Sequence, residues 1–125
     1  MALQRGNPVN WFEIPVTDIT RAKDFYEYVL ECKLSFQERK RMKLAEFPMK
    51  DGPGASGALV QAIGYTPLHS GTLVYFTVEN IEETLARVEK KGGKLLIPKT
   101  DIGEYGYVAH FEDSEGNQVA IHSMQ

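Results

Sequence analysis

Hydrophobic and polar residues alternate between positions 9 and 16 with the period of two that is typical of a β-strand. One face of this predicted strand is mixed and carries Trp11, Glu13 and Pro15. The other face is wholly apolar and carries Phe12, Ile14 and Val16. We expect the apolar face to pack against helices and the mixed face to line a cavity.

The spacing of apolar residues then changes to three and four, which predicts a helix with one buried stripe. The stripe consists of Ile19, Ala22, Phe25, Tyr26, Val29 and Leu30. Asp18 or Thr20 is placed to cap this helix, because a short polar side chain can accept hydrogen bonds from its free N–H groups. Positions 9–30 therefore predict a strand that leads into an amphipathic helix.

The same strand–helix pattern returns at an offset of 62 residues when Val16 is aligned with Val78. The aligned pairs are Ile14 with Phe76, Asp18 with Asn80 and Ile19 with Ile81. Asn80 is followed three residues later by Glu83, as in a capping box, and Gly92-Gly93 is placed to end the second helix. An internal repeat of this kind predicts two copies of one structural unit.

Three further strands are predicted after each helix, so that each half consists of a strand, a helix and three strands. They occupy residues 33–39, 43–47 and 55–62 in the first half, and 94–97, 107–111 and 118–122 in the second. Residues 64–71 and 98–106 are predicted loops. The fold class is α+β, with two βαβββ modules, about 8–63 and 71–123, in one domain spanning residues 1–125. Because a lone module would leave one sheet face bare, we expect the mixed sheets to form an open, cup-like barrel with helices outside.

Composition and charge narrow the range of partners. The chain of 125 residues has a net charge of −3, which argues against a nucleic-acid partner. No apolar run approaches about 18 residues, so we expect no membrane partner. Residues 1–6 lack a hydrophobic signal core, and Cys32 is the single cysteine, so the expected location is cytoplasmic.

Four short motifs occur in order along the chain. They are Val16-x-Asp18-x-x-Arg21-Ala22-x-x-Phe25-Tyr26, Val78-x-Asn80, Lys91-Gly92-Gly93 and Phe111-x-Asp113-x-Glu115-Gly116-Asn117. Together they resemble the glyoxalase, bleomycin-resistance and extradiol-dioxygenase superfamily, also called the vicinal oxygen chelate fold. The likeness extends from about Val9 to His122. It implies a cup shared by both modules and a homodimer, often formed by exchange of modules.

Metal-dependent members of this superfamily hold a divalent cation in the cup, with His or Glu ligands from four strands. The resemblance places the ligand positions at Trp11, Leu73, Val60 or Gln61, and Ala120. The apolar side chains cannot bind a metal, and an amide is a poor anchor. We therefore expect no cofactor and neither glyoxalase I nor dioxygenase chemistry at the usual site. The alternative is a displaced site for zinc, nickel, manganese or iron, built from Glu13 and the histidines at 69, 110 and 122.

Glu13 and His122 are the candidate catalytic residues. Glu13 lies on the predicted cavity face, where a carboxylate could act as general acid or base. His122 lies two residues after Ala120 on the same predicted face and could pair with Glu13, bind a ligand or sit at the rim. The alternative for Glu13 is a carboxylate satisfied by a neighbouring Tyr, His or Lys.

Other residues predicted on the cavity walls could hold a small organic molecule. These candidate ligand-binding residues are Trp11, Gln61, Leu73, Tyr75, Thr77 and Ala120. Two functions follow from this arrangement. The first is a metal-independent protein that binds a small organic molecule, similar to drug-sequestering resistance proteins. The second is an enzyme of the lyase, isomerase or dioxygenase type that uses Glu13 or a displaced metal.

Overall fold

The computed structural model describes residues 7–125, so the segment 1–6 discussed above lies outside the described residues. The first module contains β1 (Trp11–Pro15), α1 (Ile19–Leu30), β2 (Ser35–Arg39), β3 (Met42–Glu46) and β4 (Ser56–Ala62). The second contains β5 (Tyr75–Thr77), α2 (Ile81–Lys90), β6 (Lys94–Asp101), a 3₁₀ helix (Gly103–Tyr105), β7 (Tyr107–Glu112) and β8 (Gln118–Ser123). The predicted α+β fold of two βαβββ modules is confirmed.

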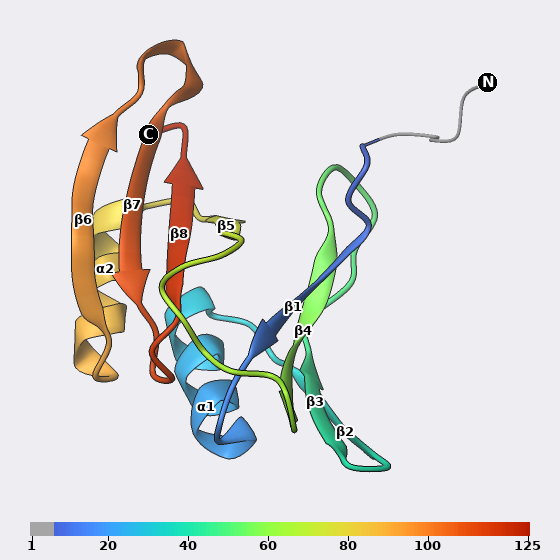
Figure 1. The fold of residues 1–125 in the computed structure, drawn as a ribbon. Coiled ribbons are helices and arrows are strands. Elements are labelled where there is room, and N and C mark those ends of the chain that lie inside the picture. Colours follow the sequence, from blue (N-terminus) through green and yellow to red (C-terminus); the bar gives the residue numbers. More distant parts are fainter. Residues whose placement is uncertain (1–6) are drawn as a thin grey trace.

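Each module forms one mixed four-stranded sheet, with the strand orders β1-β4-β3-β2 and β5-β8-β7-β6. The first strand of each module runs parallel to the last, and the other neighbours are antiparallel. The sheets do not close into a barrel. Figure 1 shows them spread apart as an open cup, with β1 and β5 on the inner edges.

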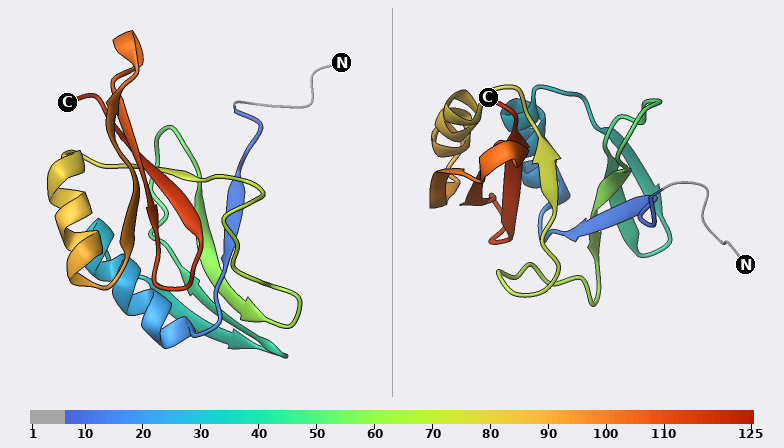
Figure 2. Two further views of the ribbon diagram at one scale, coloured as in Figure 1. Left: turned by 60° about the vertical axis from the view of Figure 1, so that its left-hand side comes forward. Right: turned by 90° about the horizontal axis from the view of Figure 1, so that it is seen from above.

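Both helices cover the outer faces of the sheets, on the side opposite the segment that connects the modules (Figure 2). This connecting segment consists of residues 63–74, between β4 and β5. The helices form because their apolar stripes have a buried surface to meet: Ile19, Phe25 and Val29 of α1 are all buried. In α2 the buried residues are Ile81, Thr84 and Val88, while Leu85 is only partly buried.

The two modules share one hydrophobic core on this outer side. The ring of Phe12 lies 5.7 Å from that of Phe76 in an edge-to-face arrangement, and Phe25 lies 6.2 Å from Phe111. Ile14 is buried in the same core, whereas Glu13 on the opposite face of β1 is exposed. The alternation predicted for the first strand is therefore confirmed, and its apolar face joins the modules.

Most strand boundaries lie within two residues of the prediction, and the C-terminal end of β6 differs most. Strand β6 continues to Asp101, although Pro98 was expected to begin a loop. Proline is tolerated here because β6 lies at the edge of its sheet and its pairing with β7 shifts register on both sides of Ile97. The repeat predicts a strand over residues 73–78, but β5 covers only Tyr75–Thr77. The residues before Tyr75 meet β8 through isolated hydrogen bonds, such as that from the Ala120 N–H to the Val74 carbonyl at 2.9 Å.

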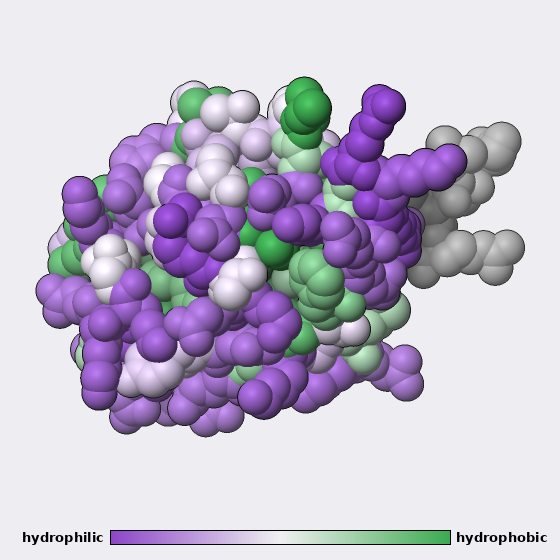
Figure 3. Space-filling view, turned by 90° about the horizontal axis from the view of Figure 1, so that it is seen from below, coloured by the Kyte–Doolittle hydropathy of each residue, from purple (hydrophilic) through white to green (hydrophobic). Residues whose placement is uncertain are grey.

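The surface of the molecule is mainly polar on the face shown in Figure 3. Hydrophobic residues on that face lie in small separate groups between hydrophilic ones. This face therefore presents no broad apolar surface of the kind that marks a large interface. Among the described residues, no helix is long and apolar enough to cross a membrane.

Candidate functional site

The largest cavity described, about 730 Å³, lies between β1, the connecting segment and the start of β8. Its apolar and aromatic lining includes Val9, Trp11, Phe12, Leu68, Leu73 and Tyr75. Its polar lining includes Glu13, Thr66, Ser70, Thr72, Asn117 and Gln118. An apolar cavity with a few polar groups is the usual composition of a small-molecule site. We call this cavity the cup.

Glu13 projects from β1 on the cup side, and both of its carboxylate oxygens accept hydrogen bonds. The Tyr65 hydroxyl donates to Oε1 over 2.9 Å, and the Trp11 indole N–H approaches Oε2 at 3.4 Å. The hydrogen bond to the carboxylate raises the pKa of Tyr65 above its ordinary value. Tyr65 comes from the connecting segment, so this contact also ties that segment to the first sheet.

The opposite wall of the cup is formed by Tyr75 and Gln118 of the second module. His110 is paired with Ala120 in the sheet. The centre of its ring lies 5.8 Å from the centre of the Tyr75 ring, in an edge-to-face arrangement. The Gln118 amide N–H donates to His110 Nδ1 over 2.9 Å, which leaves the Gln118 carbonyl oxygen as a hydrogen-bond acceptor. The alternation of β7 therefore places His110 on the same face of its sheet as Tyr75.

The connecting segment is held across the cup by three contacts with the second module. His69 Nε2 lies 2.6 Å from Glu112 Oε1, and the Asn117 side chain accepts from Leu68 N–H at 3.2 Å. Gln118 N–H in turn donates to the Leu68 carbonyl at 3.3 Å. These contacts make the segment a wall of the cup.

His122 is not among the residues that line the cup, and its hydrogen bond goes to the 3₁₀ segment. Its Nε2 is 2.6 Å from the carbonyl oxygen of Tyr105, so this nitrogen carries the proton and donates to the 3₁₀ segment. Thr77 is paired in register with His122 and is exposed outside the cavity lining. Ala120 is fully buried, between Tyr75 and His110 in the sheet.

Gln61 has a contact that the sequence did not suggest. Its side-chain oxygen accepts from the backbone N–H of Ile19 over 2.8 Å, at the first turn of α1. The register with β1 explains this direction, since Val60 pairs with Pro15 and Gln61 therefore faces the helix side of the sheet. Of the six predicted ligand-binding residues, the cavity lining contains Trp11, Leu73 and Tyr75, but neither Gln61, Thr77 nor Ala120.

The residues at the superfamily's ligand positions do not fit a metal ion. Trp11 and Leu73 line the cup with an indole and an isobutyl group, while Val60 and Ala120 are fully buried. None of these side chains offers a lone pair of the type that zinc, nickel, manganese or iron binds. Within residues 7–125, no three His, Cys, Asp or Glu side chains converge on a possible metal position.

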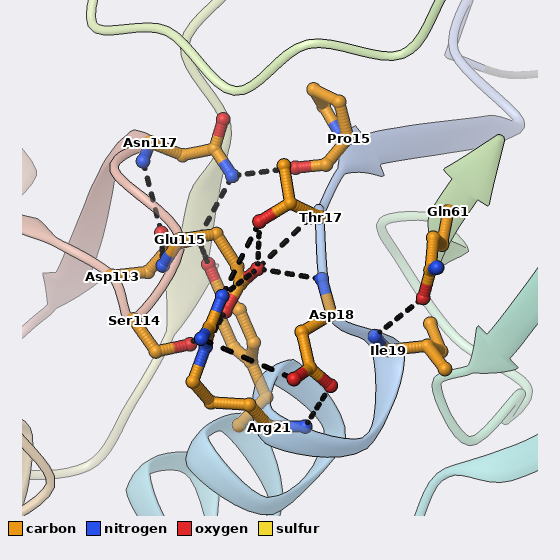
Figure 4. Close-up of polar contacts among 11 residues, drawn as sticks. Pro15, Thr17, Asp18, Ile19, Arg21, Gln61, Asp113, Ser114, Glu115 and Asn117 are labelled. Atoms are coloured by element: carbon orange, nitrogen blue, oxygen red, sulfur yellow. Dashed lines mark hydrogen bonds and ion pairs between the residues drawn. The ribbon is translucent and has the colours of Figure 1, made fainter. Parts of the chain in front are cut away.

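A network of polar contacts at the start of α1 joins the modules, and the sequence analysis did not assign it (Figure 4). Glu115 from the β7–β8 turn accepts hydrogen bonds of 2.9 Å from the backbone N–H groups of Thr17 and Asp18. It also receives the Arg21 guanidinium, with 2.7 Å from Nε to Oε2. Burial alone would raise the pKa of Glu115, but these hydrogen bonds outweigh it and lower the pKa to about 2. Glu115 thus supplies the negative charge that a helix N-terminus favours.

The same turn contributes a second, buried set of contacts. Asp113 accepts from the Tyr26 hydroxyl at 2.6 Å and from Asn117, through both the backbone N–H at 2.9 Å and the side-chain amide at 3.0 Å. The Asn117 amide also donates to the Pro15 carbonyl at 2.8 Å. Asp113, Glu115 and Asn117 all belong to the last sequence motif, which could have pointed to this junction. Because Asn117 also lines the cup, the junction fixes the position of one cup wall.

The sequence profile of the Glyoxalase/Bleomycin resistance protein/Dioxygenase superfamily matches residues 9–121. The chain therefore belongs to this superfamily, as the four motifs predicted. A glyoxylase-like domain-containing protein from Didymella fabae is 28% identical over 117 residues, which cover 90% of this chain and 91% of the relative.

Solved structures share the fold over nearly the whole chain. TnmS3, an antibiotic binding protein from a Streptomyces species, has a TM-score of 0.70 at 25% identity, over 98% of both chains. A glyoxalase I variant from Zea mays has a TM-score of 0.71 at 20% identity, over 94% of this chain and 46% of the maize chain. This chain thus spans less than half of the maize protein, and that likeness shows the fold alone.

Proposed function

We propose that this protein binds a small organic molecule with a flat apolar part in its cup, without the metal used by many relatives. The observation that carries the proposal is the position of Trp11 and Leu73. By the resemblance, both fall at positions that hold metal ligands in metal-dependent members of the superfamily, and both line a cavity of about 730 Å³. Apolar and aromatic walls favour contact with the flat faces of a ligand. The 25% identity with an antibiotic binding protein over 98% of both chains supports this choice.

Trp11 gives the proposal a direct test, because it is the single tryptophan of the chain. Planar aromatic compounds would be titrated against the full chain, and we expect at least one to change Trp11 fluorescence with saturation. Tyr75→Ala should weaken that binding, since Tyr75 forms the opposite wall. Tyr105→Ala is the matched control, because Tyr105 is also exposed but lies outside the cavity lining. The absence of saturable binding across the set would contradict the proposal.

The metal-free part of the proposal has its own measurement. Thermal unfolding would be followed with zinc, nickel, manganese and iron, alongside the metal content of the purified protein. A ligand that binds only the folded state raises the melting temperature. We expect neither a stoichiometric metal nor a stabilising shift. A stoichiometric metal or a stabilising shift would instead favour a metalloenzyme with displaced ligands over the metal-free binding protein.

A second candidate is an enzyme of the lyase or isomerase type in which Glu13 moves a proton. The contact that favours it is the hydrogen bond between Tyr65 and Glu13, which holds the carboxylate in place on the cup wall. If a compound bound in the cup is converted, Glu13→Gln should abolish turnover and retain binding. Equal turnover by both proteins would remove Glu13 from that role.

A further inference from the structure

Glu13 is the single charged side chain among the described residues that line the cup. Its two hydrogen-bond donors, Tyr65 and Trp11, are both neutral. Glu13 makes no ion pair with a Lys, Arg or His within residues 7–125. Among the described residues, the cup therefore carries a negative charge that no cation within ion-pair distance compensates.

This uncompensated carboxylate sets a condition on any molecule that fills the cup. A bound molecule removes water from Glu13, and burying an unpaired carboxylate is costly. The two neutral donors occupy only part of the carboxylate, which has about four lone-pair sites. A ligand that places a positive charge beside Glu13 offsets this cost, whereas a neutral ligand of the same shape does not.

The aromatic walls favour the same kind of ligand. Trp11 and Tyr75 retain 36% and 51% of their surface exposed, so their rings are available to a bound molecule. Aromatic faces attract cations as well as flat apolar groups. On the second wall, the carbonyl oxygen of the Gln118 side chain is a further acceptor, while one of its two amide N–H groups donates to His110. The cup thus offers acceptors and aromatic faces to a donor that carries positive charge.

We propose that the molecule bound in the cup is a cationic aromatic compound, whose positively charged nitrogen lies against Glu13 and whose flat body lies between Trp11 and Tyr75. This inference rests on the proposed binding function and adds the charge of the ligand. It identifies Glu13 as the residue that determines specificity, through a charge that Glu13→Gln removes with almost no change in side-chain size.

The test compares acridine with N-methylacridinium, which have nearly the same shape and differ by a permanent positive charge. Equilibrium dialysis of the full chain gives both dissociation constants under the same conditions. We expect the cation to bind about tenfold more tightly, from one partly exposed ion pair with added cation–π contact. Raising the salt concentration should reduce this preference, because salt screens the charge.

Two variants connect the preference to Glu13. Glu13→Gln should bind both compounds with the affinity that the wild type has for acridine. Glu38→Gln removes the same charge from an exposed position outside the cup lining and should keep the preference. Equal binding of the two compounds by the wild type, or a preference that survives in Glu13→Gln, would overturn the inference and leave the binding function standing. Failure of both compounds to bind would count against the inference and the proposed function together.

Discussion

Tyr26 and Asp113 lie 87 positions apart in the chain and are joined by a buried hydrogen bond of 2.6 Å. Tyr26 belongs to α1 of the first module and Asp113 to the β7–β8 turn of the second. Burial raises the pKa of Asp113, although its hydrogen bonds with Tyr26 and Asn117 act in the opposite direction. This contact therefore joins the modules at a place where water cannot replace a lost partner.

Tyr26→Phe should destabilise the protein by about 1–3 kcal/mol, because the buried carboxylate of Asp113 loses one of its hydrogen-bond donors. Urea unfolding followed by circular dichroism measures the change. Tyr28→Phe is the matched control, since Tyr28 lies in the same helix and its ring faces Lys91 without a side-chain hydrogen bond among those described. Equal stabilities of the two variants would show that the Tyr26 hydroxyl contributes nothing.

Glu115 should make the protein sensitive to acid. Its pKa is about 2 in the folded protein, below the ordinary value of 4.5. A lowered pKa stabilises the fold when the group is ionised, so this contribution is complete above about pH 5 and is lost as the pH falls towards 2. The side chain of Glu115 is fully buried, but that of Arg21 is 54% exposed, so we expect a loss of about 2 kcal/mol rather than the full value of the shift.

The variant Glu115→Gln isolates this contribution. It should be less stable than the wild type at pH 7, and the difference should shrink between pH 5 and pH 2. The measurement is the free energy of unfolding at several pH values. Parallel pH profiles for the two proteins would contradict the assignment.

Gly57→Ala should be more damaging than glycine replacement elsewhere. A Cβ atom at Gly57 would lie 2.1 Å from the carbonyl oxygen of Phe12, its register partner on β1. Relief requires movement of β1, which carries Trp11 and Glu13, so we expect a cost above about 2 kcal/mol. Gly52→Ala is the comparison, because its Cβ meets nothing within 4 Å and only the positive φ of 123° is unfavourable.

The melting temperatures of Gly57→Ala and Gly52→Ala compare the cost of steric crowding with the cost of backbone strain. The double variant Phe12→Leu with Gly57→Ala should recover little, since the nearest obstacle is a backbone atom. Recovery to the wild-type melting temperature would mean that the Phe12 ring, rather than the strand, is the obstacle.

The hydrogen bond between Tyr65 and Glu13 can be observed by spectroscopic titration. Tyrosinate absorbance is measured during titration of the wild type and of Tyr65→Phe. The difference between the two curves reports the ionisation of Tyr65 alone. Its pKa should lie above the ordinary value of 10.0, because ionisation would place two negative charges together. In Glu13→Gln the pKa of Tyr65 should fall towards that ordinary value. A pKa that is the same in both proteins would show that the hydrogen bond is not formed in solution.

Local features of the fold could be predicted because their causes lie within a few residues. The Asp18 side chain accepts from the Arg21 N–H at 3.0 Å, and Asn80 accepts from the Glu83 N–H at 2.9 Å. Each cap spans three positions, so the sequence contains both partners. The 62-residue repeat then supplied the module architecture, since the same local pattern occurs twice.

Contacts between distant parts of the chain could not be predicted from the local sequence. Gln61 reaches Ile19 across 42 positions, and Glu115 reaches Arg21 across 94. A one-residue change of register decides whether Gln61 or Val60 faces the cup, and the sequence left both open. The alternation of β1 did place Glu13 on the cup side, but its partner Tyr65 comes from a segment with no periodic pattern.

The connecting segment of residues 63–74 has a consequence for assembly. Contacts such as Tyr26 with Asp113 would form equally well with the same residue of a second chain, so their chemistry does not select one pairing. What favours the pairing within one chain is the tether, which holds the modules at an effective concentration in the millimolar range. Shortening or stiffening those twelve residues would therefore favour a dimer with exchanged modules, while the interface itself stayed unchanged.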